Sequence, residues 1–168
     1  MPGSGKTTVG RQLARRLGLP FYDSDHLIEE RLGCSIREYF AREGEAAFRD
    51  VEEQVLRGLA QGPAAVVATG GGAVVRPATR EALRAAGKVI YLRSTPEELF
   101  RRVRHDRQRP LLQVADPLAR LRALHAERDP LYREAAHFNI ETGRPSVPTL
   151  VNMIMMQLEL AGVLPLAP

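Results

Sequence analysis

The chain has one cysteine, no tryptophan and no long apolar run. The single cysteine, Cys34, rules out a disulfide within the chain, and no segment has the character of a membrane-spanning helix or a secretory signal. Aromatic residues make up only 5% of the sequence, which leaves few surfaces on which single-stranded nucleic acid could stack. We therefore expect a cytoplasmic protein that binds neither a membrane nor nucleic acid, and we take a monomer as its default state.

The sequence also lacks any block of like charges. Lys and Arg outnumber Asp and Glu by 24 to 20, and the excess is spread along the chain. Such a distribution suits small anionic substrates better than a nucleic-acid backbone. With 44% hydrophobic residues, 168 residues suffice for one packed core and are too few for two ordinary domains. We expect one domain, residues 1–168.

Short β-branched runs alternate with longer amphipathic segments. The runs predicted as strands are residues 19–23, 65–69, 89–93 and 138–142. Among the segments between them, one helical face carries Val9, Leu13 and Leu17. Four prolines stand where helices are expected to begin: Pro77, Pro96, Pro117 and Pro130. This alternation is typical of a parallel α/β sheet.

The N-terminus carries the end of a phosphate-binding loop. Gly3-Ser4-Gly5-Lys6-Thr7-Thr8 matches the last part of the pattern G-x-x-x-x-G-K-[ST]. The glycines let backbone N–H groups face a β-phosphate, and Lys6 reaches the β- and γ-phosphates. Thr7 offers its hydroxyl to Mg²⁺. The alternative is a flexible glycine-rich N-terminus followed by an ordinary surface lysine.

No apolar run precedes this loop in the sequence. A loop of this type is normally held between a buried strand and the helix that follows it. We therefore expect a gap in the sheet at the place of that strand, with unpaired strand edges and exposed apolar faces. The free-energy cost of such a gap could exceed the marginal stability of a domain.

Two aspartates follow the run 19–23. The alternation of a strand end aims Asp23 and Asp25 toward the same side of the carboxyl edge of the sheet, where ligands bind in open α/β sheets. Asp23 could hold Mg²⁺ through water, and Asp25 could orient the attacking hydroxyl or accept its proton. The alternative is that these residues cap the next helix, with Ser24 a further candidate for the cap.

A glycine run, Gly70-Gly71-Gly72, follows the predicted strand 65–69. Glycine lets the backbone approach a ligand closely, so that its N–H groups could bind a substrate. The alternative is a plain tight turn between strand and helix.

Three arginines have a distinctive sequence context. Arg49 lies beside the apolar face of its helix, Arg109 precedes a proline, and Arg128 begins the segment Arg128-Asp129-Pro130-Leu131-Tyr132. By residue chemistry alone, a solvated helix surface is the better interpretation of each of them.

These motifs stand in the order found in shikimate kinases, and the chain resembles that family from residue 1 to about residue 142. The matching segments are residues 3–8, 23–25, 48–50, 70–72, 109–112 and 128–132. The resemblance implies a three-layer P-loop kinase fold with a parallel five-stranded sheet, order 2-3-1-4-5, and flanking helices. It also implies that this chain lacks the first strand, which lies in the middle of that sheet.

The resemblance implies transfer of the ATP γ-phosphoryl group to the 3-hydroxyl of shikimate, with Mg²⁺, in chorismate and aromatic amino acid biosynthesis. A gluconate-kinase-like enzyme would share the phosphate-binding loop and a lid over ATP. Arg49 and Arg128 together favour a substrate whose ring carries a carboxylate. A nucleoside monophosphate kinase needs an insertion that the sequence does not have. A non-catalytic ATP-binding module is the alternative from another class.

The resemblance also assigns roles to the candidate residues. It implies that residues 3–8 wrap the phosphates, with Lys6 catalytic and Mg²⁺ on Thr7 and, through water, on Asp23. It implies that Asp25 binds the reacting hydroxyl. The implied substrate-binding residues are Asp25, Arg49, Gly70, Gly71, Gly72 and Arg128. It further implies that Arg109 is a catalytic and ATP-binding residue of a mobile lid, about residues 104–115, that closes over ATP.

Overall fold

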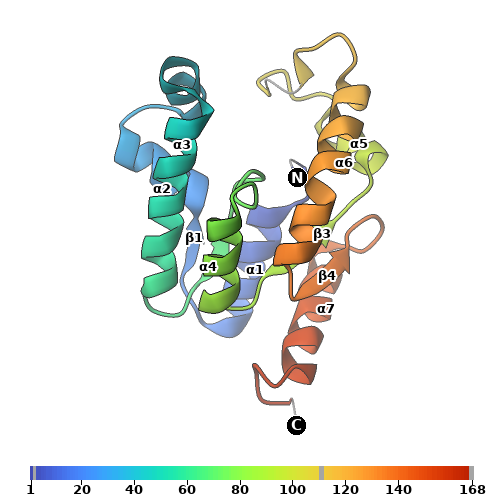
Figure 1. The fold of residues 1–168 in the computed structure, drawn as a ribbon. Coiled ribbons are helices and arrows are strands. Elements are labelled where there is room, and N and C mark those ends of the chain that lie inside the picture. The colour runs from blue at the N-terminus through green and yellow to red at the C-terminus, as the bar shows by residue number, and fades with distance from the viewer. Residues whose placement is uncertain (2, 110–111, 167–168) are drawn as a thin grey trace.

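The computed structural model describes residues 1, 3–109 and 112–166. Helices and strands alternate along the chain (Figure 1). The described strands are short: β1 (Phe21–Asp23), β2 (Val66–Ala68), β3 (Ile90–Arg93) and β4 (Phe138–Glu141). Each lies within a run that the sequence predicts as a strand, so these four predictions are confirmed.

The helices connect and cover the strands. They are α1 (Lys6–Leu17), α2 (Ser24–Leu32), α3 (Ile36–Gln61), α4 (Pro77–Ala86), α5 (Pro96–Val103), α6 (Pro117–Ala135) and α7 (Val147–Leu160). Pro77, Pro96 and Pro117 begin α4, α5 and α6, as predicted, because proline lacks only an N–H that the first turn leaves unbonded anyway. No described helix combines the length and the apolarity needed to cross a membrane.

The prediction that Pro130 begins a helix is wrong, because Pro130 lies inside α6. A proline there removes one helical hydrogen bond, and tertiary contacts on either side offset the loss. The buried carboxylate of Asp129 accepts hydrogen bonds from the Tyr91 hydroxyl at 2.8 Å and from Arg93 Nε at 3.3 Å. Tyr132, two residues beyond the proline, is also buried. Packing thus carries the helix across a position where the local sequence favours a break.

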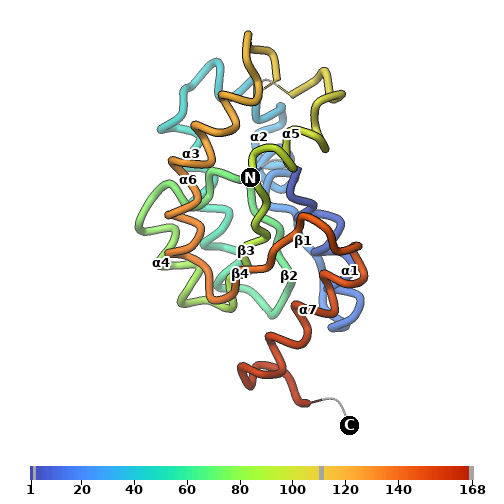
Figure 2. Tube along the Cα trace, turned by 90° about the vertical axis from the view of Figure 1, so that its right-hand side faces the viewer, coloured from blue at the N-terminus to red at the C-terminus, as the bar shows by residue number. Residues whose placement is uncertain are grey.

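The strands form two parallel pairs. In β1–β2 Tyr22 lies opposite Val67, and in β3–β4 Leu92 lies opposite Ile140. Among the described residues the two pairs are separate sheets, with no ladder between β2 and β3. Figure 2 shows the strands between a layer with α3, α4 and α6 and a layer with α1 and α7. The α/β class with parallel strands is therefore confirmed.

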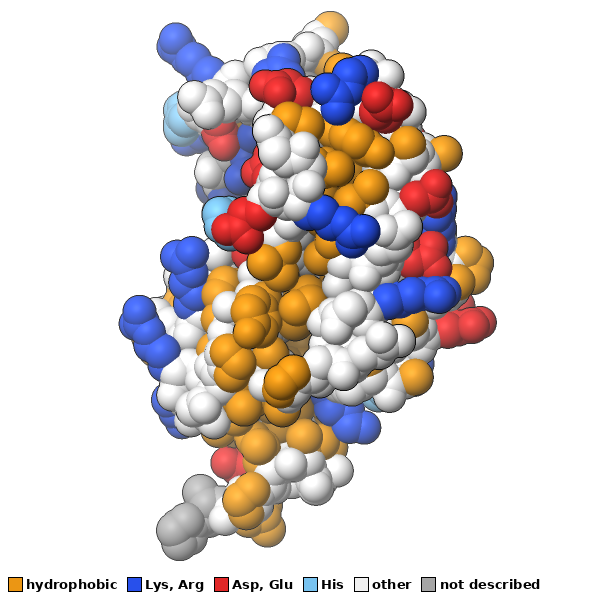
Figure 3. All heavy atoms as spheres, turned by 90° about the vertical axis from the view of Figure 1, so that its left-hand side faces the viewer, with side chains coloured by type: hydrophobic (Ala, Val, Ile, Leu, Met, Phe, Trp, Pro, Cys, Tyr) orange, Lys and Arg blue, Asp and Glu red, His pale blue; other side chains and the backbone are white. Residues whose placement is uncertain are grey.

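The core has two parts, which lie on opposite faces of β3. Tyr91 belongs to the part formed with α5 and α6, and Leu92 belongs to the part formed with α1 and α7. The predicted face of the first helix is confirmed, since Val9 and Leu13 are buried in the second part and Leu17 packs against it. Figure 3 shows that hydrophobic side chains also gather in a band on one outer face. The described chain thus leaves some apolar surface uncovered.

Candidate active site

The loop before α1 has the geometry of an anion-binding turn. Gly3 and Gly5 have φ angles of 77° and 84°, in the left-handed region that glycine adopts readily. Because α1 begins at Lys6, the unbonded N–H groups and the positive end of the helix dipole face this loop. The Nζ atom of Lys6 donates a hydrogen bond to the Met1 carbonyl at 2.8 Å. The buried Ser4 hydroxyl has no hydrogen-bond partner among the described residues.

Asp23 connects the loop to the acidic segment. Its Oδ2 atom accepts a hydrogen bond from the Thr7 hydroxyl at 3.2 Å. Its Oδ1 atom accepts from the backbone N–H groups of Asp25 at 3.0 Å and His26 at 3.4 Å, so Asp23 is the N-cap of α2. The capping alternative therefore applies to Asp23, whereas Asp25 and Ser24 lie inside the first turn of the helix.

The atoms of Thr7 and Asp23 are chemically suited to Mg²⁺, which prefers hydroxyl and carboxylate oxygens. Among the described residues, no group of three or more His, Cys, Asp and Glu side chains could hold a metal ion by itself. The two oxygens therefore fit an ion that takes its other ligands from nucleotide phosphates and water. Thr8, the next residue of α1, is exposed.

Asp25 and Lys6 each affect the pKa of the other. Burial raises the pKa of Asp25 above its ordinary value, the nearby Asp23 carboxylate adds to the rise, and Lys6 opposes it. Burial likewise lowers the pKa of Lys6, and Asp25 is the main charge that opposes this shift. A carboxylate with a raised pKa is a better proton acceptor than an exposed aspartate, so the environment of Asp25 suits a general base.

The glycine run 70–72 packs directly against charged side chains. A Cβ atom on Gly70 would lie 2.6 Å from Oδ1 of Asp25, closer than real contacts allow. A Cβ atom on Gly71 would lie 3.4 Å from Nη1 of Arg128. The absence of side chains here thus brings the backbone of this loop to the functional groups of two predicted site residues.

Arg49 lies on the third side of the same loop. A Cβ atom on Gly72 would overlap its guanidinium group. Arg49 is buried, donates from Nη1 to Glu52 Oε1 at 2.8 Å, and stacks on the Phe48 ring at 5.1 Å from the centroid. Burial raises the pKa of Glu52, and Arg49 opposes that rise. Glu52 is a site residue that the sequence analysis missed, although the spacing of three residues on one helix indicates such a pair.

Arg128 projects from α6 and pairs with no carboxylate among the described residues, and its buried Nε has no hydrogen-bond partner there. One turn later, the Tyr132 hydroxyl donates a hydrogen bond to the Gly71 carbonyl at 2.6 Å. Burial raises the pKa of Tyr132, so this hydroxyl keeps its proton. Tyr132 is the second site residue that the sequence analysis did not assign, although it stands in the quoted motif. A cation without a carboxylate partner suits an anionic ligand group.

Arg109 is held within its own loop. Its Nε donates to Asp106 Oδ2 at 2.8 Å, and its side chain is about two-fifths exposed. Its charge helps to lower the pKa of Lys6, after burial, so it acts on the phosphate loop from a distance. It forms no hydrogen bond with another predicted site residue among those described. The next two residues of its motif, 110 and 111, lie outside the described part of the chain.

Apart from Arg109, the predicted residues lie in one cluster with two ends. The phosphate loop, Thr7 and Asp23 lie at one end, and Arg49 and Arg128 converge on the glycine run at the other. The Asp25 carboxylate lies against Gly70 of this run, and the positive charges of Lys6 and Arg49 both lower its pKa.

Comparisons with known proteins agree with this geometry. A sequence model of the family "Shikimate kinase" matches residues 2–159. The shikimate kinase of Paracidovorax citrulli is 63% identical over 171 residues, covering 100% of this chain and 93% of the relative. That of Ralstonia nicotianae is 60% identical over 161 residues, covering 96% of this chain and 85% of the relative.

Solved structures give the same result. The shikimate kinase of Acinetobacter baumannii in complex with shikimate superposes with a TM-score of 0.89 at 48% identity, covering 97% of this chain and 91% of that one. The shikimate kinase of Bacteroides thetaiotaomicron superposes with a TM-score of 0.87 at 33% identity, covering 94% and 93%. Given the family match over almost the whole chain and these identities, the chain belongs to the shikimate kinase family.

Proposed function

We propose that the chain transfers the γ-phosphoryl group of ATP to the 3-hydroxyl of shikimate and releases shikimate 3-phosphate and ADP, as a step in chorismate and aromatic amino acid biosynthesis. The observation that carries this proposal is the convergence of Asp25, Arg49 and Arg128 on one glycine run beside a phosphate loop. The superposable relative from A. baumannii was solved with shikimate, which supports the choice of acceptor.

At the acceptor end, Arg128 and Arg49 bind the carboxylate and ring oxygens of shikimate. A planar guanidinium group can meet a carboxylate with two parallel N–H donors. Arg128 offers these donors without a competing carboxylate among the described residues, whereas Arg49 is oriented by Glu52. The backbone of the glycine run 70–72 completes this wall, with the Gly71 N–H as a further donor to the ring substituents.

At the nucleotide end, residues 3–8 wrap the phosphates and Lys6 binds the β- and γ-phosphates. Thr7 and, through water, Asp23 would hold Mg²⁺, which would neutralise negative charge on the phosphates. The hydrogen bond between Thr7 and Asp23 keeps the two oxygens together for this purpose.

Asp25 acts on the reacting hydroxyl. It accepts the proton of the 3-hydroxyl while the hydroxyl oxygen bonds to the γ-phosphorus, and the bond from that phosphorus to the β–γ bridging oxygen breaks to release ADP. Lys6 stabilises the charge on the transferred group and also favours the ionised form of Asp25. Arg109 adds positive charge over the nucleotide when its loop closes.

We also propose one kinase domain over residues 1–168, with a lid at about residues 104–115 that excludes water. Within this segment, Arg109 pairs with Asp106 at 2.8 Å. The five-stranded order 2-3-1-4-5 is part of the proposal, because the pairs β1–β2 and β3–β4 match strands 2-3 and 4-5 of that order. A monomer in the cytoplasm fits the single cysteine, Cys34.

An ADP-release assay with Mg²⁺-ATP tests this function against its two alternatives. We expect ADP release that depends on shikimate and is absent with gluconate at the same concentration. Release that depends on gluconate would indicate another small-metabolite kinase. Saturable ATP binding without acceptor-dependent release in the folded protein would indicate a non-catalytic ATP-binding module.

Replacing Tyr132 with Phe removes the hydroxyl that joins α6 to the Gly71 carbonyl. A buried hydrogen bond of this kind contributes about 1 kcal/mol, so we expect the KM for shikimate to rise about fivefold with kcat changed by less than about twofold. Steady-state kinetics at saturating ATP measure both. The control is Tyr91→Phe, which removes another buried hydroxyl, one that contacts Asp129 and not the glycine run. An equal rise in KM for both variants would show that Tyr132 has no specific positioning role.

A further inference from the structure

Asp129 follows Arg128 in α6, and its carboxylate is buried, with the residue only 6% exposed. Its Oδ1 atom accepts hydrogen bonds from two donors of β3, the Tyr91 hydroxyl at 2.8 Å and Arg93 Nε at 3.3 Å. Its Oδ2 atom lies 3.1 Å from Nε of Arg133, one turn further along α6. One buried carboxylate thus ties the helix to a strand.

This carboxylate is ionised, and its charge is balanced. Burial alone would raise the pKa of Asp129, but the hydrogen bond from Tyr91 and the two arginines outweigh burial and hold the pKa below its ordinary value. Neighbouring residues of a helix do not face each other, so the carboxylate does not compete for the Arg128 guanidinium. The buried Nε of Arg128 has no hydrogen-bond partner among the described residues. Asp129 can therefore hold α6 while Arg128 stays open to an anionic ligand.

The turn of α6 that carries these residues lacks one helical hydrogen bond. Pro130 has no backbone N–H to donate, and its ring crowds the carbonyl four residues earlier. Helices usually bend or break at such a position, yet α6 continues past it. The turn therefore depends on contacts with other elements, and the hydrogen bonds of Asp129 to β3 are such contacts.

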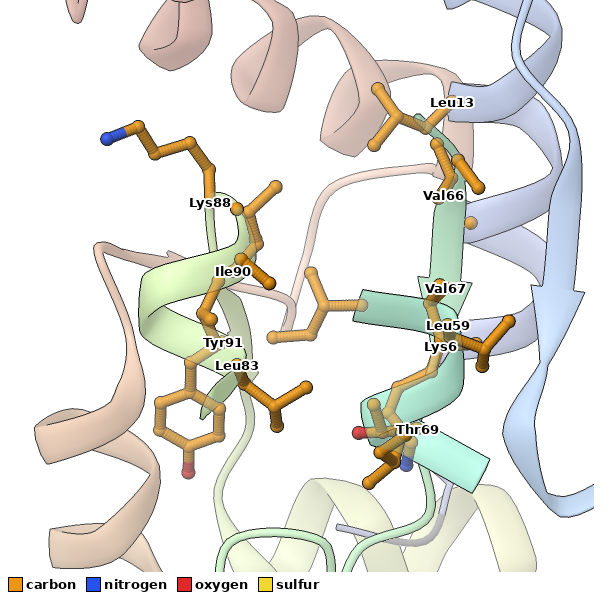
Figure 4. Close-up of a pocket in the computed structure, with 18 of the residues that line it drawn as sticks. Lys6, Leu13, Leu59, Val66, Val67, Thr69, Leu83, Lys88, Ile90 and Tyr91 are labelled. Atoms are coloured by element: carbon orange, nitrogen blue, oxygen red, sulfur yellow. The ribbon is translucent and has the colours of Figure 1, made fainter. Parts of the chain in front are cut away.

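A pair of aromatic rings gives the second contact between this turn and β3. The ring centroids of Tyr91 and Tyr132 lie 4.8 Å apart. Figure 4 shows Tyr91 on the β3 wall of a cavity of about 490 Å³, opposite Val67 of β2, and Tyr132 lines the same cavity. Apolar packing around the two rings is therefore incomplete. More of the restraint on the turn falls to the hydrogen bonds of Asp129.

The same turn presents two side chains to the glycine run 70–72. The Tyr132 hydroxyl donates to the Gly71 carbonyl at 2.6 Å, and a Cβ atom on Gly71 would lie 3.4 Å from Nη1 of Arg128. The contact of a guanidinium group with a carboxylate through two N–H donors is directional, and such groups need partners that hold them in place. The position of this turn thus determines how well Arg128 can meet a carboxylate.

We propose that Asp129 is a positioning residue for the acceptor substrate. Anchored to Tyr91 and Arg93 of β3, it fixes the proline-containing turn of α6 and so directs the Arg128 guanidinium toward the substrate carboxylate. The inference rests on the proposed function, since it takes Arg128 to bind the carboxylate of shikimate. No hydrogen bond or ion pair joins Asp129 to the phosphate loop among the described residues, so ATP binding should not depend on it.

The test is Asp129→Asn, which keeps the size of the side chain and an acceptor for the Tyr91 hydroxyl but removes the charge that binds the two arginines. We expect the KM for shikimate to rise about tenfold, with kcat and the KM for ATP changed by less than about twofold. The matched control is Glu127→Gln, an exposed carboxylate that precedes Arg128 as Asp129 follows it. We expect its constants to equal those of the parent. Steady-state kinetics with each substrate varied in turn measure all of them.

The same substitution in an Arg128→Ala background separates positioning from general support of the fold. If Asp129 acts through Arg128, Asp129→Asn lowers kcat/KM for shikimate about tenfold in the parent but less than about twofold when Arg128 is absent. Equal fractional losses in the two backgrounds would show that Asp129 only supports the fold and would overturn the proposal. A KM for shikimate equal to that of the parent in Asp129→Asn would overturn it as well.

A second variant cuts the same link from the strand if Asp129→Asn does not fold. The double variant Tyr91→Phe/Arg93→Gln leaves Asp129 paired with Arg133, and we expect the same rise in the KM for shikimate, about tenfold. Tyr91→Phe alone leaves Arg93 in place, so its KM should change by less than about twofold. A KM equal to that of the parent in the double variant would contradict the inference.

The parent enzyme distinguishes failure of this inference from failure of the proposed function. A parent that does not turn over shikimate would refute the proposed function and this inference with it. A parent that turns over shikimate, with variants that keep its KM, would refute the role of Asp129 alone.

Discussion

Replacing Asp25 with Asn is expected to lower kcat about a thousandfold while leaving ATP affinity within about twofold. General bases contribute 10²- to 10⁴-fold, and the amide of Asn keeps the size of the side chain but cannot accept the proton in the same way. The raised pKa of Asp25 and its coupling to Lys6 mark it as the carboxylate best suited to this role at the site. Turnover with saturating shikimate and ATP measures kcat, and equilibrium titration of the variant with ATP measures affinity.

The matched control for this variant is Glu30→Gln, because Glu30 is a carboxylate on the same helix that lies on the surface and pairs with His26. We expect its kcat to equal that of the parent. Unchanged turnover in Asp25→Asn would remove Asp25 from the mechanism. A large loss of ATP affinity in the same variant would instead show that Asp25 mainly supports Lys6 in nucleotide binding.

Replacing Arg128 with Ala is expected to raise the KM for shikimate about 100-fold and to change the KM for ATP by less than about threefold. Removal of one partner from a buried charged pair costs about 2–5 kcal/mol in binding. Arg128 is the cleaner arginine to test, because Arg49→Ala would also leave the buried Glu52 carboxylate without its partner at 2.8 Å and so lower stability. Steady-state kinetics with each substrate varied in turn measure both constants.

A substrate without the carboxylate charge tests whether Arg128 binds that group. With the methyl ester of shikimate, which has no carboxylate charge, the parent and Arg128→Ala should have KM values within a fewfold of each other, because the interaction is already lost. The control variant is Arg120→Ala, an exposed arginine on the same helix, for which we expect no change. A loss confined to ATP affinity in Arg128→Ala would show that this arginine serves the nucleotide and not the acceptor.

Local patterns in the sequence were sufficient to predict the strands and several helix starts. The four strands and the helices that begin at Pro77, Pro96 and Pro117 follow from apolar periodicity and from the chemistry of a helix start. Pro130 was the exception, because contacts of Asp129 and Tyr132 with distant residues override the local tendency to break α6. Local sequence contains no information on those contacts.

The site was predictable to a different degree. The phosphate loop is contiguous, so its residues could be named directly. In contrast, Arg49, Gly72 and Arg128 are far apart in the chain, and only the resemblance to a known family grouped them. Helical spacing and a motif position indicate Glu52 and Tyr132 only weakly, because what distinguishes them is their contact in space with the Arg49 guanidinium and the Gly71 carbonyl. Sequence analysis offered helix capping as the alternative for this acidic segment, and the backbone geometry shows that Asp23 is the residue that caps α2.

The most direct measurement of the central claim is the identity of the phosphorylated product. The chain is incubated with ATP, Mg²⁺ and shikimate, and the product is examined by phosphorus–proton correlation NMR. We expect one new phosphomonoester whose phosphorus couples to the proton on C3 of shikimate, formed only when all three components are present. A phosphoryl group on another hydroxyl, or ADP formed with inorganic phosphate as its only partner, would contradict the account.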